Sequence, residues 1–245
     1  MNRTLCSFVC ALVLSMPAQA DTLRLAVAAN FTAVLEQLVT AFDPDQQHDI
    51  SISSASTGVL YTQITRGAPF DVFLAADRVR PERLEAEGLI LPGSRATYAI
   101  GQLALWQPGN SPQSASDLLP GRLAIANPAT APYGLAAQQV LKANNQWQPE
   151  QLVQGTNIAQ TYQFVDSGNV AQGFVALSLL LQQGVPEQHW ALVPSHMHAS
   201  IEQQLVRLKR SENNALAARF LQYIQTPEAQ ELIRQRGYGI ADGTD

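Results

Sequence analysis

The stretch ISSASTGVLYTQITRGAPFDVFLAAD, residues 52–77, decides the fold because it holds a strand, a helix and a second strand in direct succession. Residues 49–53, which begin just before the stretch and overlap its start, alternate in polarity as a strand does, and the apolar run Val72–Ala75 is typical of a buried strand. Between them, Gly58–Thr65 carries apolar residues at helical spacing and ends near Gly67. Two strands joined through a helix predict parallel pairing in a helix-covered sheet.

The same alternation continues on both sides of this stretch. A strand at 23–28 and a helix at 31–42 precede it, and a helix at 81–87 follows, with Pro81 in its first turn. The remaining predicted elements are strands at 103–106, 123–126, near 153, at 174–177 and at 202–208, and helices at 134–142, 158–165, up to 184, at 214–224 and at 227–236. We therefore predict an α/β protein of two lobes, each a helix-covered and mainly parallel sheet. Residues 21–101 and 207–245 are assigned to lobe 1, and residues 102–206 to lobe 2.

Residues 1–20 have the pattern of a secretory signal peptide. Arg3 is followed by an apolar run and by the small-x-small ending Ala18-Gln19-Ala20, after which cleavage is expected. The apolar run is too short for a permanent membrane anchor. Both cysteines, Cys6 and Cys10, lie within it, so the mature chain of 225 residues would contain no disulfide and no thiolate metal site.

The charge balance argues against polyanionic partners. Without Arg3, 14 basic residues face 20 acidic ones, which gives a net charge of −6 with neutral histidines. Nucleic acids and anionic lipid surfaces are poor partners for such a protein. We expect a protein that binds no nucleic acid and no membrane, and that is a monomer.

Four loops share an unusual composition. They are residues 28–31, 53–58, 127–134 and 155–160; each is uncharged, rich in small or hydroxyl residues, and opens a predicted helix. Basic residues are absent from 25–65, 123–141 and 143–206. Ligands of parallel sheets bind where strands end and helices begin, and helix starts offer unpaired amide N–H groups and a partial positive charge. The loops therefore predict a receptor for a small anion, built from neutral donors.

The form of the anion follows from the donors. Hydrogen phosphate keeps a proton and needs an acceptor, whereas the four loops contain no carboxylate. A fully deprotonated tetrahedral dianion such as sulfate, molybdate or tungstate suits them better. Sulfate is smaller and holds its water more tightly, so a cavity sized for longer metal–oxygen bonds would disfavour it.

Each loop taken singly also has an ordinary structural explanation. Asn30 could cap the helix that begins at Phe31, and Asn157 could cap the helix at Ile158. The serines before Gly58 could serve as cap and turn residues. Only the occurrence of four such loops at one sheet edge favours a binding site.

Five segments resemble the periplasmic molybdate-binding proteins of ABC transporters. They are LRLAVAANF (23–31), residues 52–77 quoted above, YAIGQLALW (98–106), IANPATAPYGLAAQQVL (125–141) and SGNVAQGFVALS (167–178). The resemblance covers nearly the whole mature chain in order and spacing. It implies a type II periplasmic-binding fold whose two lobes close on the oxyanion, and a protein that passes molybdate or tungstate to an inner-membrane ABC permease. It implies no cofactor, no catalytic residue and no cation ligand.

The same resemblance assigns the ligand contacts. It places Ala29 and Asn30 after the first strand, Thr57 before the glycine of the second loop, Tyr133 after the proline of the third, and the backbone of Ile158 at the fourth. Ala29 lacks the hydroxyl often found at its position, so only its backbone could contribute. Another branch of the family has a binding tyrosine where this chain has Ala176, and Tyr133 would supply the phenol instead.

Other chemistry has weaker support. Asp71 and Asp77 could form an acid–base pair of a secreted hydrolase, but a capping role for Asp77, and hydrogen bonds that Asp71 accepts from neighbouring loop amides, explain them better. His196 and His198 are two residues apart in a predicted loop, which is too few ligands for a metal site. We expect a binding protein rather than an enzyme, with another oxyanion such as sulfate as the alternative ligand.

Overall fold

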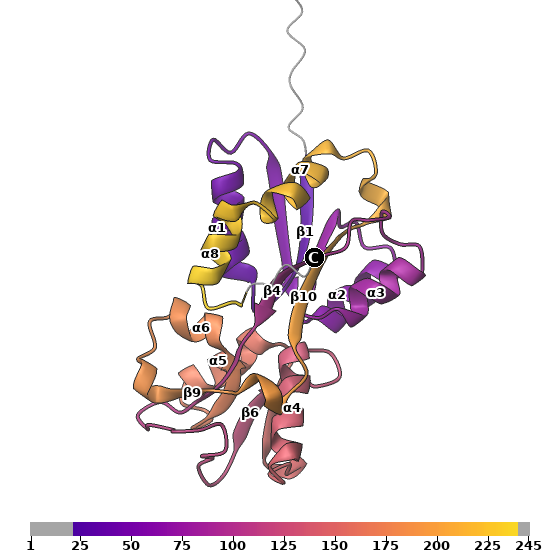
Figure 1. Cartoon of the computed structure of the whole chain (residues 1–245). Coiled ribbons are helices and arrows are strands. Elements are labelled where there is room, and N and C mark those ends of the chain that lie inside the picture. Colours follow the sequence, from indigo (N-terminus) through magenta and orange to yellow (C-terminus); the bar gives the residue numbers. More distant parts are fainter. Residues whose placement is uncertain (1–21, 240–245) are drawn as a thin grey trace, which may run out of the picture.

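The computed structural model describes residues 22–239, which form two α/β lobes, one above the other in Figure 1. Each lobe is built on a five-stranded sheet. The predicted signal peptide lies outside the described residues. No helix within them is long and apolar enough to cross a membrane.

The first sheet has the order β2-β1-β3-β10-β4. Its strands are β1 (Thr22–Ala28), β2 (Asp49–Ala55), β3 (Val72–Leu74), β4 (Ala96–Gly101) and β10 (Ile201–Arg207). β1 runs parallel to β2 and β3, whereas β10 is antiparallel to β3 and β4. The stretch 52–77 thus supplies the end of β2, helix α2 (Thr57–Thr65) and β3, as predicted.

The second sheet has the order β7-β6-β8-β5-β9. Its strands are β5 (Leu103–Trp106), β6 (Leu123–Ala126), β7 (Leu152–Gly155), β8 (Gly173–Ala176) and β9 (Trp190–Leu192). β6 is parallel to β7 and β8, and β5 is antiparallel to β8 and β9. Both sheets are therefore mixed, but in each of them only one strand runs opposite to the other four: β10 in the first sheet and β5 in the second, each being the strand that follows a passage between the lobes.

Helices cover both faces of each sheet. In the first lobe, α1 (Thr32–Phe42), α7 (Ala215–Ile224) and α8 (Pro227–Gln235) pack on the face that holds Leu23, Leu25 and Val27. Helices α2 and α3 (Val79–Ala86) pack on the opposite face with Ala26 and Phe73. Alternate residues of β1 thus enter two separate cores, as the period of a strand requires.

The second lobe repeats this arrangement at smaller size. Helix α4 (Pro132–Ala143) packs on one face, and α5 (Ile158–Asp166) and α6 (Leu177–Gln182) contribute to the other. Four short 3₁₀ turns complete the described elements: Pro149–Gln151, Glu187–His189, Ser195–Met197 and Lys209–Ser211. Figure 1 shows α4, α5 and α6 in the lower lobe and α2 and α3 beside the upper sheet.

The chain passes between the lobes from β4 to β5 and again from β9 to β10 (Figure 1). The second passage corrects the predicted lobe boundary. Residues 201–206 were assigned to lobe 2, but they lie in β10, which pairs with β3 and β4 of the first sheet. The apolar pattern predicted the strand, whereas its sheet depends on long-range pairing that the pattern does not report.

Candidate functional site

A small cavity lies between the lobes, where four strand ends meet four helix starts. Its volume is about 10 Å³, counted as the space open to the centre of a water-sized sphere, and it is lined by Ala28, Ala29, Asn30, Ser56, Thr57, Ala76, Ala131, Pro132, Tyr133, Asn157 and Ile158. All five predicted contact residues belong to this lining, so the structure brings the four uncharged loops together. The volume is below the range of about 300–1,000 Å³ common for drug-sized ligands, which favours a small ion.

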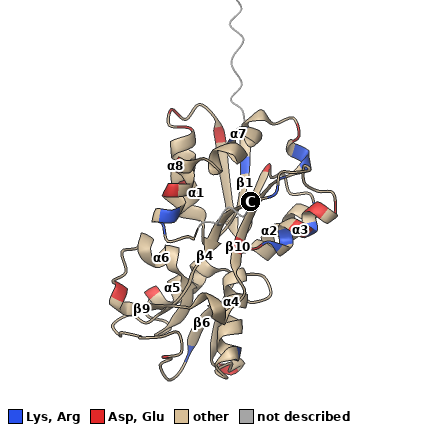
Figure 2. Cartoon of the chain, viewed as in Figure 1, with Lys and Arg blue, Asp and Glu red and all other residues tan. Residues whose placement is uncertain are grey.

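The lining contains no charged side chain. In Figure 2 the basic residues lie mainly on the first lobe, and few mark the second. Three of the loops open α2, α4 and α5, so their amides carry the partial positive charge of helix N-termini.

Several backbone N–H groups at the strand ends and in the first helical turns are unpaired. Among residues 22–239, no hydrogen-bond partner is found for the N–H groups of Asn30, Thr57, Tyr133 and Ile158. Buried amides are nearly always paired, so four unpaired ones around one cavity indicate a place for an acceptor. The amide of Ala29 differs, because it donates to the carbonyl of Ala55 at 3.0 Å. The backbone contact from Ala29 stays a prediction: its side chain lines the cavity, but its N–H is already paired with main chain.

The hydroxyl of Thr57 is placed to donate a hydrogen bond to a ligand. Thr57 is fully buried, and its Oγ1 accepts a hydrogen bond from the amide of Ala76 at 3.0 Å. No acceptor for its proton is found in the described part of the chain. The proton is thus free for a ligand.

Tyr133 has the same arrangement on the second lobe. It is 2% exposed, and its phenolic oxygen accepts from Nε2 of Gln203 at 3.2 Å. Burial, together with the phenols of Tyr238 and Tyr98, raises the pKa of Tyr133 well above its ordinary value. The phenol therefore keeps its proton at neutral pH and acts as a donor.

Asn30 does not cap α1, because the cap position is Phe31 and it makes no side-chain cap bond. Instead, the Asn30 amide nitrogen Nδ2 donates to Oε1 of Gln203 at 2.9 Å and to the hydroxyl of Tyr238 at 3.1 Å. Both side-chain protons are in use, so Asn30 can offer its backbone N–H to a ligand but not its Nδ2.

Asn157 is the ordinary cap that the sequence suggested. Its side chain accepts from the amide of Gln160 at 2.9 Å, while the Gln160 side chain accepts from the amide of Thr156 at 2.6 Å. This arrangement resembles a capping box, except that the Gln160 side chain reaches the residue before the cap; it fixes the first turn of α5 and leaves the amide of Ile158 unpaired.

Ser56 lies in the second loop but is not among the predicted contacts. It is 4% exposed and lines the cavity, and its Oγ has no hydrogen-bond partner within the described residues. It occupies the cap position of α2 without making a cap bond. The sequence Ser-Thr-Gly at a helix start was the feature that could have identified Ser56, but it does not distinguish a serine that caps the helix from one that binds the ligand.

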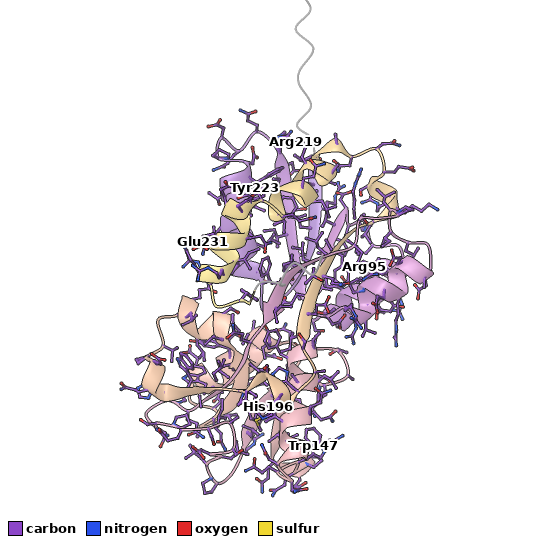
Figure 3. The ribbon with its side chains drawn as sticks, viewed as in Figure 1. Arg95, Trp147, His196, Arg219, Tyr223 and Glu231 are labelled. Carbon is purple, nitrogen blue, oxygen red and sulfur yellow. The ribbon has the colours of Figure 1, made fainter. Side chains whose placement is uncertain are left out.

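The remaining candidates lie outside the cavity. Asp77 accepts from the amide of Arg80 at 3.0 Å and pairs with the Arg80 guanidinium, and Asp71 accepts from the amide of Arg24 at 2.8 Å. His196 lies on the second lobe beside α4 (Figure 3), and no group of three potential metal ligands is found in residues 22–239. The capping role of Asp77 is confirmed, whereas Asp71 accepts from an amide of strand β1 and pairs with Arg210, and not with amides of a neighbouring loop as predicted.

A ligand cavity closed between two α/β lobes that are joined by two chain passages defines a binding protein that captures its solute by lobe closure. The chain belongs to the bacterial extracellular solute-binding protein family, whose sequence pattern matches residues 23–239. It therefore acts outside the cytoplasm as a binding protein and not as an enzyme.

Individual relatives narrow the comparison. A protein named molybdate-binding protein ModA from Azotobacter vinelandii is 42% identical over 93% of this chain and 94% of its own length. One of the same name from Rhodobacter capsulatus is 39% identical over 92% of this chain and 91% of its own. The solved structure of the Azotobacter vinelandii periplasmic molybdate-binding protein superposes with a TM-score of 0.84 at 36% identity, covering 90% of this chain and all of that one. The predicted resemblance and the two-lobed α/β fold are confirmed.

The fold alone does not choose the ligand. The sulfate-binding protein SubI from Mycobacterium tuberculosis shares it with a TM-score of 0.75 at only 15% identity, over 91% of this chain and 88% of that one. The choice of ligand must be argued from the cavity.

Proposed function

We propose that this protein captures molybdate or tungstate between its lobes in the periplasm and delivers it to an ABC permease of the inner membrane. The names of the two relatives above 35% identity support the oxyanion and the transport role. The signal peptide expected at residues 1–20 supports export, and the mature protein would be a monomer without a cofactor, molybdate being cargo.

The observation that carries the proposal is a small cavity lined by donors without charge. The amides of Asn30, Thr57, Tyr133 and Ile158, with the hydroxyls of Thr57 and Tyr133, all have protons to give, and no carboxylate is present to receive one. Such a set binds a ligand that only accepts hydrogen bonds. A fully deprotonated tetrahedral oxyanion has four acceptor oxygens and no proton.

The number of donors is sufficient for tight binding. A hydrogen bond to a charged partner contributes about 1.5–3 kcal/mol, so about six would supply on the order of 10 kcal/mol before costs. Micromolar affinity requires about 8 kcal/mol. Ser56 Oγ would add a seventh donor. Neutral dipoles fixed in the folded protein replace the hydration shell without reorganising, and lobe closure excludes water.

The test is calorimetric titration of the purified protein with molybdate, tungstate, sulfate and phosphate under the same conditions. We expect molybdate and tungstate to bind with micromolar or better affinity, sulfate at least about tenfold more weakly, and phosphate not at all. Preferred binding of sulfate would support the alternative oxyanion. Preferred binding of phosphate, or binding of an uncharged solute alone, would contradict the proposal.

The transport role has its own test. A strain that lacks its molybdate-binding protein should regain growth on limiting molybdate when this chain is exported with its residues 1–20. The same chain without them should not restore growth, because it would remain in the cytoplasm. Restored growth by both forms would contradict the periplasmic assignment.

A further inference from the structure

Gln203 is a fully buried polar side chain that no ligand assignment uses. It lies in β10 of the first sheet, is 0% exposed, and hydrogen-bonds with three other side chains. Its neighbour Gln204 is also buried but bonds to a different set of side chains, those of Thr97, Glu202 and Arg95. Of these two glutamines, only Gln203 hydrogen-bonds with residues that line the ligand cavity, Asn30 and Tyr133.

The hydrogen bonds fix which end of the Gln203 amide faces which neighbour. Its Oε1 accepts from Nδ2 of Asn30 at 2.9 Å and from the hydroxyl of Tyr98 at 3.0 Å. The nitrogen Nδ2 of Asn30 can only donate, so the atom that it faces is the carbonyl oxygen. The single proton of the Tyr98 hydroxyl has two acceptors within reach, this oxygen and the carbonyl of Ala75 at 3.2 Å. The nitrogen Nε2 must then lie at the other end, where it is 3.2 Å from the phenolic oxygen of Tyr133.

The hydrogen bonds around Asn30 fix which of its side-chain atoms is the donor. The hydroxyl of Tyr238 donates to the Asn30 carbonyl at 2.7 Å, so its oxygen is free to accept from Nδ2 of Asn30. Tyr238 is itself held by the pairing of Gly239 with Ile100, whose two backbone hydrogen bonds are 2.7 and 2.8 Å long. Two bonds in succession therefore lead from the first lobe to Tyr133: Nδ2 of Asn30 donates to Oε1 of Gln203, and Nε2 of Gln203 donates to the oxygen of Tyr133.

This arrangement decides what Tyr133 can do. An oxygen that accepts the N–H of Gln203 must send its own proton elsewhere, and its cavity-lining position leaves the ligand as the acceptor. Gln203 belongs to the first lobe and Tyr133 to the second, so this bond joins the two lobes.

Two local features make room for this contact. The register of β10 against β4 shifts between Gln203 and Gln204, which leaves Tyr98 as an extra residue on β4. Bulges of this kind redirect side chains next to binding sites. At the lobe connection, a Cβ on Gly101 would lie 2.4 Å from the Tyr133 hydroxyl and 2.9 Å from Nε2 of Gln203, so a side chain there would push the pair apart.

We propose that Gln203 is a positioning residue that orients the Tyr133 hydroxyl toward the bound oxyanion through a hydrogen bond between the lobes. The inference rests on the proposed function, because it names the group through which an oxyanion is held. Gln203 itself does not touch the ligand.

The test is a double-mutant cycle measured by molybdate titration. Gln203→Met keeps the length of the side chain but removes its amide, and we expect it to weaken binding by about tenfold. Tyr133→Phe removes the donor and should weaken binding by at least as much. In the Tyr133→Phe background, Gln203→Met should change the affinity by less than about twofold, because the residue through which it acts is gone.

Gln204→Met is the matched control. It removes a neighbouring buried amide of the same strand, and should lower the melting temperature without changing the affinity by more than about twofold. A second probe is the NMR signal of ¹³Cζ-labelled tyrosine, assigned with Tyr133→Phe. In wild type this signal should move when molybdate is added, and in Gln203→Met it should start from a different position before addition.

If Gln203→Met does not fold, Gly101→Ala serves instead, because it separates the same two atoms while both side chains remain. It should weaken molybdate binding strongly in wild type and less in Tyr133→Phe, where the nearest atom is absent. Multiplicative effects of the two substitutions, or wild-type affinity in folded Gln203→Met, would overturn this inference and leave the proposed function intact. Failure of the wild-type protein to bind any oxyanion would overturn both.

Discussion

The amide of Gly58 donates to the carbonyl of Thr130 at 2.8 Å, and this single bond joins the first turn of α2 in one lobe to the loop before α4 in the other. The two segments are in close contact, since a Cβ on Gly58 would lie 3.0 Å from both Cα and O of Thr130. Both flank the cavity, because Thr57 and Ala131 belong to its lining. The lobes thus meet through main chain directly beside the site.

Gly58→Ala should therefore weaken oxyanion binding without unfolding the protein. The added methyl group keeps the loops a few tenths of an ångström apart, and a binding site closed by two lobes loses affinity when closure is incomplete. We expect a loss of about three- to tenfold by calorimetry. Val59→Ala is the control, because Val59 is 39% exposed on the same helix. Unchanged affinity in Gly58→Ala would show that the close approach is not needed for closure.

Another bond between the lobes comes from Arg80. Its Nη2 donates to the carbonyl of Ala129 at 3.0 Å, and Asp77 holds the guanidinium in place from the same lobe. Arg80→Gln should increase the rate of ligand dissociation, because the bond exists in the closed form and must break on opening. The side chain is partly exposed, so we expect a change of about 1 kcal/mol, or roughly fivefold.

Stopped-flow displacement of bound oxyanion measures this rate. Arg83→Gln removes a nearby charge of the same helix and should leave the rate unchanged. Equal effects of the two substitutions would indicate that net charge, and not the bond to Ala129, controls dissociation.

Ser56→Ala should weaken binding and leave the unliganded protein at least as stable. The Ser56 Oγ is buried without a partner among residues 22–239, so its removal takes away an unsatisfied polar group. A ligand that accepts its proton would lose one hydrogen bond, a change of about tenfold in affinity. Melting curves with and without molybdate measure both quantities. Ser54→Ala, on an exposed hydroxyl paired with Thr32, is the control.

Thr57→Val should differ by weakening both binding and folding. The substitution removes the donor to the ligand and also strands the amide of Ala76, which now donates to Thr57 Oγ1. A buried unpaired amide costs about 1–3 kcal/mol, and the free energy of unfolding should fall by that amount. Thr57→Ser restores the hydroxyl and should recover most of both losses. Chemical denaturation with and without ligand provides the comparison, and an unchanged free energy of unfolding would contradict the role of the Ala76 bond.

The sequence predicted local elements well where the residues alone decide them. The strands 103–106 and 123–126 have the predicted ends, because uninterrupted apolar runs have one stable local outcome. β4 and β9 were missed: the ATYAIG of β4 contains threonine and glycine, and β9 lies in a stretch rich in proline and histidine. Both strands are defined by pairing with distant partners.

In the candidate site, too, local features could be predicted from the sequence, whereas features that depend on distant residues could not. The four loops were recognisable because their composition and their places at helix starts are local properties. The roles of individual side chains were not, since Asn30 bonds to residues 173 and 208 positions away in the sequence. Whether its side chain caps a helix, binds a ligand or supports Tyr133 depends on Gln203 and Tyr238, which only the folded chain brings near.

Three buried phenols beside the cavity predict how stability depends on pH. Burial is the main cause that raises the pKa of Tyr98, Tyr133 and Tyr238 above the ordinary value near 10. Above pH 10 the unfolded chain releases these protons while the folded chain retains them, so the unfolded state binds fewer protons and stability falls as pH rises. Below about pH 9 all three are protonated in both states, and they add no pH dependence. Denaturation at intervals from pH 7 to 11 should give a constant free energy of unfolding, followed by a steep decrease.

Tyr98→Phe should make that decrease shallower. Oxyanion affinity should stay constant over the pH range in which the free energy of unfolding is constant, because the Tyr133 donor keeps its proton. A decline that begins near pH 8, or one that Tyr98→Phe leaves equally steep, would show that other groups control the alkaline limit.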